Sequence, residues 1–309
     1  MRYPRGVGMR GLILYNGYSD MPSYDHQISR IMEEFEALGV DMALQTNNVF
    51  LAHIEDGVQK VEVDVDFCIF LDKDRYASFM VESCGIRMFN SASSIAVCDD
   101  KMLTYMALSG HGISMPDSTA GPLFYDPSMP TGRDSCEVLE NRYGYPMVVK
   151  ECFGSSGKGV HLARDREGLV SILDSLRGRP YLVQRYVDTS VGEDLRVIVI
   201  GGKAIGSMLR HSDTDFRSNV ALGGSSFNQD VSDVSRSVAE KVAEVLGLDY
   251  CGVDLLKDEG GQYSIVCEVN SNAFFESFEE STGINVAKAY ALHIMQIMQK
   301  GAGSEEIIE

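Results

Sequence analysis

Three oxygen-bearing side chains lie on two apolar segments near the C-terminal end of the chain. Asp254 lies in the run 250–256, and Glu268 and Asn270 lie in the run 263–270. Positions two apart on a strand face the same side, so Glu268 and Asn270 should project together, and a hairpin would bring Asp254 beside them. Carboxylate and amide oxygens suit a hard divalent cation such as Mg²⁺, whose octahedral shell nucleotide phosphates can complete. The trio therefore predicts a cation site.

A lysine and a loop of small residues offer a place for those phosphates. The strand-like run 146–150 ends in Lys150 and leads into a Gly- and Ser-rich loop over 154–159. Small residues let backbone N–H groups close around phosphate oxygens, and the lysine adds a point charge. A flexible hairpin tip is an equally good interpretation of the loop alone. The order of residues excludes the P-loop, which needs Gly-Lys-Ser/Thr leading into a helix.

Polar residues downstream could bind the rest of a nucleotide. The apolar run 181–187 ends in polar positions whose backbone could contact an adenine edge, and Asp194 could bind ribose hydroxyls. Each could also be an ordinary strand end. Arg217, in the Gly-containing segment 215–224, can bridge phosphate oxygens with its planar guanidinium. Two more arginines, Arg196 and Arg210, lie on the preceding segment.

Composition narrows the classes of partner. The chain has 309 residues, 44% of them hydrophobic, and a net charge of −18 from 45 acids and 27 bases. Phosphate repulsion argues against a nucleic-acid partner for such a chain. No apolar stretch approaches the ~20 residues that span a bilayer, and the run 11–15 is too short for a signal peptide. The lack of such a stretch argues against a membrane partner. The seven cysteines form no CxxC pair, which favours reduced, buried thiols and a cytoplasmic location.

Hydrophobic periodicity predicts an α/β arrangement. Strands alternate with helices over about the first 95 residues, which is typical of a parallel sheet. Residues 90–110 should be a polar turn followed by one helix, and 121–134 a loop. A hairpin is expected over 196–209 and long helices over 231–246 and 284–300. Further strands are expected at 11–15, 42–44, 66–71, 86–89, 146–150 and 181–187, and further helices at 28–38, 76–83 and 167–176.

Taken in order, these segments resemble the ATP-grasp fold and, within it, the RimK-type amide ligases. The matching stretches are 98–101, 147–159, 183–187, 192–196, 215–219, 253–254 and 268–270. The resemblance implies an α/β (α+β) chain in three parts. These are an N-terminal parallel α/β pre-ATP-grasp domain over 1–95, a central lobe with the phosphate loop over 96–187, and a C-terminal lobe with the metal site over 188–309.

The resemblance also implies roles for individual residues. Lys101 and Lys150 would contact the phosphates of ATP, and Asp194 would hold the ribose. The implied nucleotide contacts further include Ser155, Ser156 and Gly157 of the loop, Gln184, Arg185, Tyr186 and Val187 of the adenine hinge, and Arg217, Ser218 and Asn219. Asp254, Glu268 and Asn270 would hold Mg²⁺, with Mn²⁺ as the alternative. Arg185 is a departure, because the family often has an acid at that position of the hinge.

The implied activity is ATP-dependent ligation. A carboxylate would attack the γ-phosphate to give an acyl phosphate and ADP, and an amine, such as the amine of glutamate, would then displace phosphate. Lys150, Arg210 and Arg217 are the catalytic candidates, and Arg210 would hold the acyl phosphate or the tetrahedral oxyanion. The carboxylate could belong to a small molecule, a peptide or a protein. Related ligases are often dimers or tetramers, which makes a homo-oligomer an open alternative that the sequence alone does not decide.

Two alternatives remain open from the sequence. One is an ATP-binding module without turnover, and the other is a peptide-modifying ligase that forms side-chain crosslinks. Substrate choice should depend on Asn16, Tyr18 and Asp20, on residues 121–134 and on the segment 272–282. The last is treated as a loop, and its acids Glu276, Glu279 and Glu280 are candidates for the substrate amine. The same segment could instead be a hydrophobic anchor with a solvated face.

Overall fold

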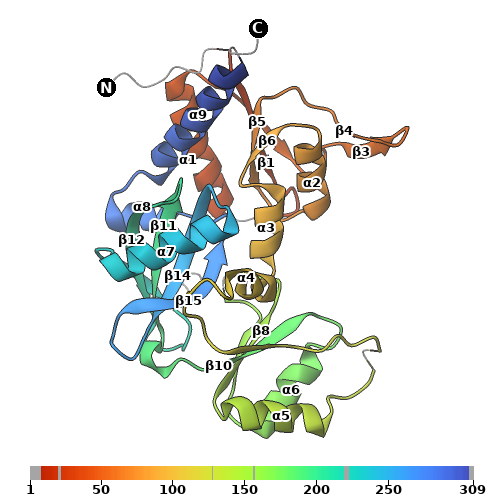
Figure 1. The fold of residues 1–309 in the computed structure, drawn as a ribbon, viewed down its shortest axis with the longest axis vertical. Coiled ribbons are helices and arrows are strands. Elements are labelled where there is room, and N and C mark those ends of the chain that lie inside the picture. The colour runs from red at the N-terminus through yellow and green to blue at the C-terminus, as the bar shows by residue number, and fades with distance from the viewer. Residues whose placement is uncertain (1–7, 20–21, 127, 156, 219–222, 306–309) are drawn as a thin grey trace.

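The computed structural model describes residues 8–19, 22–126, 128–155, 157–218 and 223–305. Three larger sheets follow one another along the chain, and a small hairpin projects from the first (Figure 1). No helix in the described part of the chain combines the length and apolar character needed to cross a bilayer.

The N-terminal sheet is parallel throughout, as predicted. Its strand order is β2-β1-β5-β6. The strands are β1 (Arg10–Tyr15), β2 (Asp41–Thr46), β5 (Phe67–Leu71) and β6 (Arg87–Phe89), and the helices are α1 (Pro22–Leu38) and α2 (Arg75–Ser83). Gly39 follows α1 with φ +74°, a conformation that glycine adopts readily. The hairpin β3 (Ala52–Glu55) and β4 (Val58–Val61) was not predicted.

The central lobe is an antiparallel sheet of order β7-β10-β8-β9, and it forms the lowest part of Figure 1. Its elements are β7 (Ser118–Ala120), α5 (Arg133–Tyr143), β8 (Met147–Glu151), β9 (Val160–Ala163), α6 (Arg166–Ser175) and β10 (Tyr181–Arg185). Its own apolar core includes Leu169, Leu173 and Val183, all buried. Strand β8 lies on the side of the lobe that faces the rest of the chain (Figure 1).

The C-terminal sheet has five antiparallel strands in the order β13-β12-β11-β14-β15. Its elements are a 3₁₀ turn (Asp188–Ser190), β11 (Glu193–Ile200), β12 (Lys203–His211), β13 (Ser225–Asn228), α7 (Asp233–Leu246), β14 (Tyr250–Lys257), β15 (Tyr263–Asn270), α8 (Glu276–Thr282) and α9 (Val286–Glu305). Helix α7 covers one face. Helix α9 returns to pack against α1 of the N-terminal part (Figure 1).

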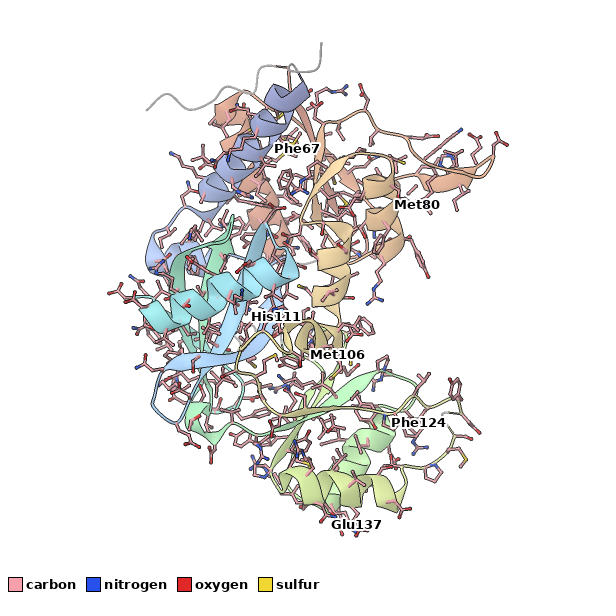
Figure 2. All side chains as sticks on the ribbon, viewed as in Figure 1. Phe67, Met80, Met106, His111, Phe124 and Glu137 are labelled. Atoms are coloured by element: carbon pink, nitrogen blue, oxygen red, sulfur yellow. The ribbon has the colours of Figure 1, made fainter. Side chains whose placement is uncertain are left out.

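One apolar core joins the first and last sheets. It includes Phe67 and Phe89 from the N-terminal part and Tyr250, Phe275 and Tyr290 from the C-terminal part. Phe67, labelled in Figure 2, is completely buried. Burial of large aromatic side chains from both parts stabilises their relative position, so the edges that face each other can form a common site.

Two expectations about local structure were wrong. Residues 90–110 form two helices, α3 (Ala92–Asp99) and α4 (Lys101–Leu108), because Asp100 is extended and its carboxylate accepts hydrogen bonds from the backbone of Met102 and Leu103. The second helix therefore begins at Lys101. The segment 272–282, expected as a loop, contains the short helix α8.

Candidate functional site

Two cavities meet where the three parts of the chain converge. The larger, about 760 Å³, lies between the N-terminal sheet and the C-terminal sheet, and the smaller, about 100 Å³, lies between the central lobe and the C-terminal sheet. Lys101, Arg210 and Glu268 line both. A molecule bound in the smaller cavity would therefore share charged neighbours with a molecule in the larger one.

A buried charge network forms the floor between the cavities. Arg210, only 4% exposed, donates two hydrogen bonds of 2.7 Å to the carboxylate of Asp194, and its Nη2 lies 2.7 Å from Oδ2 of Asp254. Arg196 binds the carboxylate of Asp254 through two hydrogen bonds of 2.7 and 2.8 Å. The hydroxyl of Ser218 donates to Asp194. Paired charges of this kind resist separation in a low-dielectric interior.

The pKa values of the two buried acids in this network shift in opposite directions. Burial works to raise the pKa of Asp254, but the two neighbouring guanidinium groups of Arg196 and Arg210 outweigh it and lower that pKa. Burial raises the pKa of Asp194, against the opposing effect of Arg210. Asp254 is therefore the more firmly ionised carboxylate of the two.

The predicted cation ligands lie on adjacent strands. Asp254 of β14 is directly opposite Glu268 of β15, and Asn270 is opposite Gly252. Glu268 and Asn270 both line the larger cavity, and Asp254 and Glu268 both line the smaller. Oε1 of Glu268 lies 3.5 Å from Nζ of Lys101.

The donor set fits a hard divalent cation. The side-chain nitrogen of Asn270 is buried without a hydrogen-bond partner, and turning the amide by 180° puts an unsatisfied oxygen in its place. Together with the two carboxylates this gives oxygen donors only. Among the described residues, no cluster of three or more His, Cys, Asp or Glu side chains is arranged to hold a metal ion. The trio contains only two acids and would leave the remaining positions to phosphates or water.

The two predicted lysines approach this wall from the other side. Lys101, the first residue of α4, donates a hydrogen bond of 2.9 Å to the carbonyl of Gly154 in the Gly/Ser loop. Lys150, at the end of β8, is 7% exposed, and its Nζ lies 3.6 Å from Sγ of Cys267. Burial works against its charge, but Cys267, Tyr105 and Glu268 raise the pKa of Lys150, so the amine is an ammonium at neutral pH.

The adenine-hinge residues line the smaller cavity. Gln184 is 1% exposed and donates a hydrogen bond of 2.8 Å to Ser118. The backbone N–H of Arg185 already donates to the carbonyl of Asp117, and its side chain forms an exposed ion pair with the same residue. Tyr186 and Val187 also line the cavity.

Arg217 ties the C-terminal lobe to the Gly/Ser loop. It donates to the carbonyls of Gly157 and Val160 at 2.8 and 3.3 Å and pairs with Asp215. Ser155 lines the larger cavity and Gly157 the smaller. Ser156 and Asn219 lie outside the described residues.

The N-terminal sheet contributes residues at the carboxyl ends of its strands. Asn16 follows β1 and Asp72 follows β5, and the Asn16 amide donates to both carboxylate oxygens of Asp72 at 3.2 Å. Both line the larger cavity, as do Tyr18 and Lys73. Ligands of open α/β sheets bind at this end of the strands. An acid or amide directly after an apolar run is therefore a sequence signal, and it could have identified Asp72.

Only some of the other residues predicted to determine substrate choice lie on a cavity wall. Glu276 and Glu280 line the larger cavity. Asp20 lies outside the described residues, and no described residue of 121–134 lines either cavity. Arg196, which had no assigned role in the sequence, lines the larger cavity and holds Asp254.

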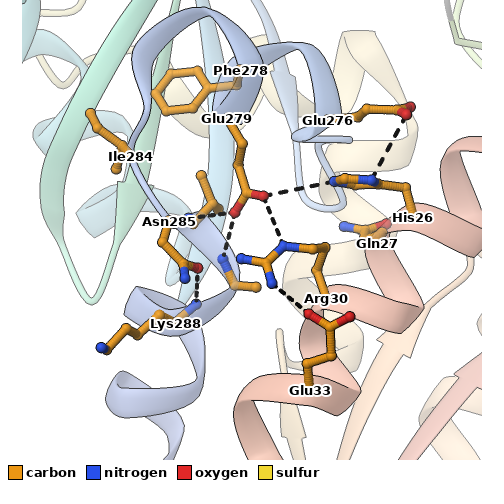
Figure 3. Close-up of polar contacts among 12 residues, drawn as sticks. His26, Gln27, Arg30, Glu33, Glu276, Phe278, Glu279, Ile284, Asn285 and Lys288 are labelled. Carbon is orange, nitrogen blue, oxygen red and sulfur yellow. Dashed lines mark hydrogen bonds and ion pairs between the residues drawn. The ribbon is translucent and has the colours of Figure 1, made fainter.

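Glu279 has a structural place instead (Figure 3). Its carboxylate accepts a hydrogen bond of 3.1 Å from Arg30 of α1 and bonds of 2.7 and 3.3 Å from the backbone N–H groups of Val286 and Ala287, the first residues of α9. His26 of α1 lies between Glu276 and Glu279, 3.8 and 3.7 Å from their carboxylates. Glu279 thus joins α8 to α1 and α9 and is absent from the cavity wall.

Glu279→Gln should lower the free energy of unfolding by about 1–3 kcal/mol, because it removes a charged acceptor from Arg30 and from the start of α9. Urea denaturation measures the change. Glu280→Gln, on an exposed neighbouring position of the same helix, is the matched control and should leave the unfolding free energy within about 0.5 kcal/mol. Equal stability of the two variants would contradict the structural role of Glu279.

Comparison with known proteins agrees with this geometry. The RimK-like ATP-grasp domain family matches residues 98–294. N-acetylaspartylglutamate synthase A of Homo sapiens is 37% identical over 263 residues, covering 84% of this chain and 65% of that protein. Beta-citrylglutamate synthase B of Homo sapiens is 38% identical over 225 residues, covering 72% of this chain and 56% of that protein. The chain thus spans less than two thirds of either relative.

Solved structures show the same fold. The crystal structure of D-alanine–D-alanine ligase from Bacillus anthracis complexed with ATP superposes with a TM-score of 0.70 at 18% identity, covering 96% of this chain and 99% of that one. The expected ATP-grasp fold is confirmed. On the family match and the identity to its relatives, the chain belongs to the RimK-like ATP-grasp family.

Proposed function

We propose that the protein is an ATP-dependent ligase that activates a carboxylate as an acyl phosphate and couples it to an amine, releasing ADP and phosphate. The observation that carries the proposal is the sharing of Lys101, Arg210 and Glu268 by the two cavities. The smaller cavity, at about 100 Å³, would hold only part of ATP, whose phosphates would extend toward these residues, and a carboxylate in the larger cavity would lie within reach of the terminal phosphate.

The chain's own charges would then support both steps. Lys150 and Arg217 would neutralise the triphosphate from the central lobe and from the segment after β12. Lys101 would hold the Gly/Ser loop over the phosphates through Gly154. Arg210 would stabilise the negative charge that develops on the acyl phosphate and on the tetrahedral intermediate. The work of the protein is positioning and neutralisation, without a covalent nucleophile.

Asp254, Glu268 and Asn270 would hold Mg²⁺, or Mn²⁺, which would neutralise phosphate oxygens when bound. Asp194, the proposed ribose contact, is 7% exposed and bonded to Arg210 and Ser218, so ribose hydroxyls would have to share its oxygens. Glu193 also lines the smaller cavity and is the adjacent acid for that role.

The larger cavity favours a ligase over an ATP-binding module. At about 760 Å³ it has the size of a small-molecule site, and a module that only binds ATP has no use for it. The names of both of these relatives contain glutamate. An amino acid such as glutamate is therefore the proposed amine.

Mass spectrometry of a reaction with ATP, Mg²⁺, mixed small carboxylic acids and mixed amino acids tests the proposal. We expect ADP, phosphate and a product whose mass equals acid plus amine minus water. Tight nucleotide binding without any such product from any pool would contradict ligase activity and support the module instead.

Glu276→Gln should raise the KM for the amine severalfold and leave nucleotide affinity unchanged, because Glu276 lies on the wall of the larger cavity and is absent from the smaller. Steady-state kinetics with varied amine, and a separate ATP titration, measure the two effects. Glu279→Gln removes the same charge three residues away but off the cavity wall, so its amine KM should not change. A Glu276 variant with unaltered KM would remove this residue from the amine site.

A further inference from the structure

The cysteine beside Lys150 is placed differently from the others in the chain. Five of the seven cysteines are buried, and only Cys84 and Cys267 are partly exposed. Cys267 lines the smaller cavity, whereas Cys84 lies at the end of α2 with its thiol donating to the carbonyl of Gln59. The chain therefore offers one partly exposed cysteine that lines the proposed nucleotide cavity and one that lies outside it.

A β-bulge explains why Cys267 points into that cavity. The pairing of β14 with β15 matches Asp254 to Glu268 and Leu255 to Val266, so Cys267 is the extra residue. Consecutive residues of a regular strand face opposite sides, yet Cys267 and Glu268 both line the smaller cavity. A bulge redirects a side chain in this way and is common beside functional sites.

A buried ammonium group, with no ion pair among the described residues, lines the same cavity. Lys150 is 7% exposed and forms no ion pair among the described residues; its hydrogen bond goes to Sγ of Cys267 at 3.6 Å. The acids that line this cavity each have a cationic neighbour already: Arg210 for Asp194 and Asp254, Lys257 for Glu193, and Lys101 for Glu268. The cation next to the thiol thus has no carboxylate in ion-pair contact among the described residues, which favours an anionic ligand.

We propose that Cys267 is a reversible modification site for small anionic thiol reagents, namely disulfides and thiosulfonates that carry an acidic group, and that its modification blocks nucleotide binding. The acidic group would pair with Lys150, as a phosphate of a nucleotide would. The adduct would then occupy the space between β8 and β15. Only the nucleotide part of this inference rests on the proposed function.

The reaction needs no group beyond the reagent. The sulfur of Cys267 attacks the divalent sulfur of a methanethiosulfonate, a new S–S bond forms, and the bond to the sulfonyl sulfur breaks. Methanesulfinate leaves with the electron pair, and the thiol proton passes to the buffer. Dithiothreitol reverses the step by exchange. Selectivity would come from access through the smaller cavity, which Cys267 lines, and from the charge of Lys150 beside it.

Paired probes of opposite charge test the site. The intact protein is treated with the anionic sulfonatoethyl methanethiosulfonate or with the cationic trimethylammonioethyl methanethiosulfonate, and the rate at each cysteine is followed by peptide mass spectrometry. The chain's net charge of −18 favours the cationic probe in general. We expect Cys267 to react at least about threefold faster with the anionic probe and Cys84 to show no such preference. Lys150→Met should abolish the preference at Cys267.

A second experiment tests whether labelling of Cys267 and binding of nucleotide exclude each other. ADP at saturating concentration should suppress labelling of Cys267 but not of Cys84. Protein labelled at Cys267 should bind ADP at least about tenfold more weakly, a change of 1.4 kcal/mol, and dithiothreitol should restore binding. Cys84→Ser should remain sensitive to the reagent, while the ADP affinity of Cys267→Ser should be the same before and after treatment.

The outcomes separate the two proposals. No labelling of Cys267, a faster reaction with the cationic probe, or full ADP affinity after labelling would overturn the modification site. An unlabelled protein that binds no ADP would contradict the proposed function, while the charge preference at Cys267, measured without nucleotide, would still support the site.

Discussion

Arg210→Met is expected to lower the free energy of unfolding by about 3–5 kcal/mol and the turnover of the proposed reaction by roughly 10²–10³-fold. Arg210 is the cation between two buried carboxylates. Asp254 would keep its two hydrogen bonds to Arg196, but among the described residues Asp194 would retain only the hydroxyl of Ser218. The destabilisation should therefore come mainly from Asp194.

A second substitution tests that cause. Arg210→Met combined with Asp194→Asn removes the unpaired charge and should recover part of the lost stability without recovering turnover, because the cation that faces the reacting groups is still missing. Urea denaturation and product formation are measured on the same preparations. Lys203→Met is the control, since its ion pair with Glu240 is exposed, and it should change stability by less than about 1 kcal/mol. A double variant no more stable than Arg210→Met would contradict this assignment.

The residues of this network were visible in the sequence, but their pairing was not. Arg196 lies directly opposite Asp254 on β11 and β14, and Asp194 lies opposite Arg210 on β11 and β12. These pairs depend on strand register, which turns and long-range packing determine and which hydrophobic alternation alone leaves open. The sequence therefore indicated which charges were unusual without indicating that they neutralise one another.

The alternation of side chains along a strand was enough to predict which residues share a face, where the inference needed only one strand. Glu268 and Asn270 share a face of β15, and both line the larger cavity, as predicted. The same rule fails one residue earlier, because the bulge at Cys267 adds a residue that no local pattern announces. The break at Asp100 is similar, since the apolar pattern of α3 and α4 runs on through a capping residue.

Glu268→Gln should remove activity without the loss of stability expected for Arg210→Met. The side chain of Glu268 is 21% exposed, and its one ion pair within the described part of the chain, with Lys101, is 3.5 Å long. Gln keeps its shape and removes only the charge, so the free energy of unfolding should change by less than about 1 kcal/mol. Turnover should fall at least about 100-fold, because this carboxylate lines both cavities and is one of the two acids proposed to hold the cation.

Nucleotide binding distinguishes the loss of a cation ligand from a general loss of charge. For the unaltered protein the Kd for ADP should be lower with Mg²⁺ than with EDTA, and in Glu268→Gln the ratio of the two values should approach one. Glu280→Gln removes the same charge from the larger cavity only, so its ratio should stay that of the unaltered protein. If Glu268→Gln kept the full effect of Mg²⁺ on the Kd, the cation would have to be held elsewhere, and Asp254, already bonded to two arginines, could not hold it alone.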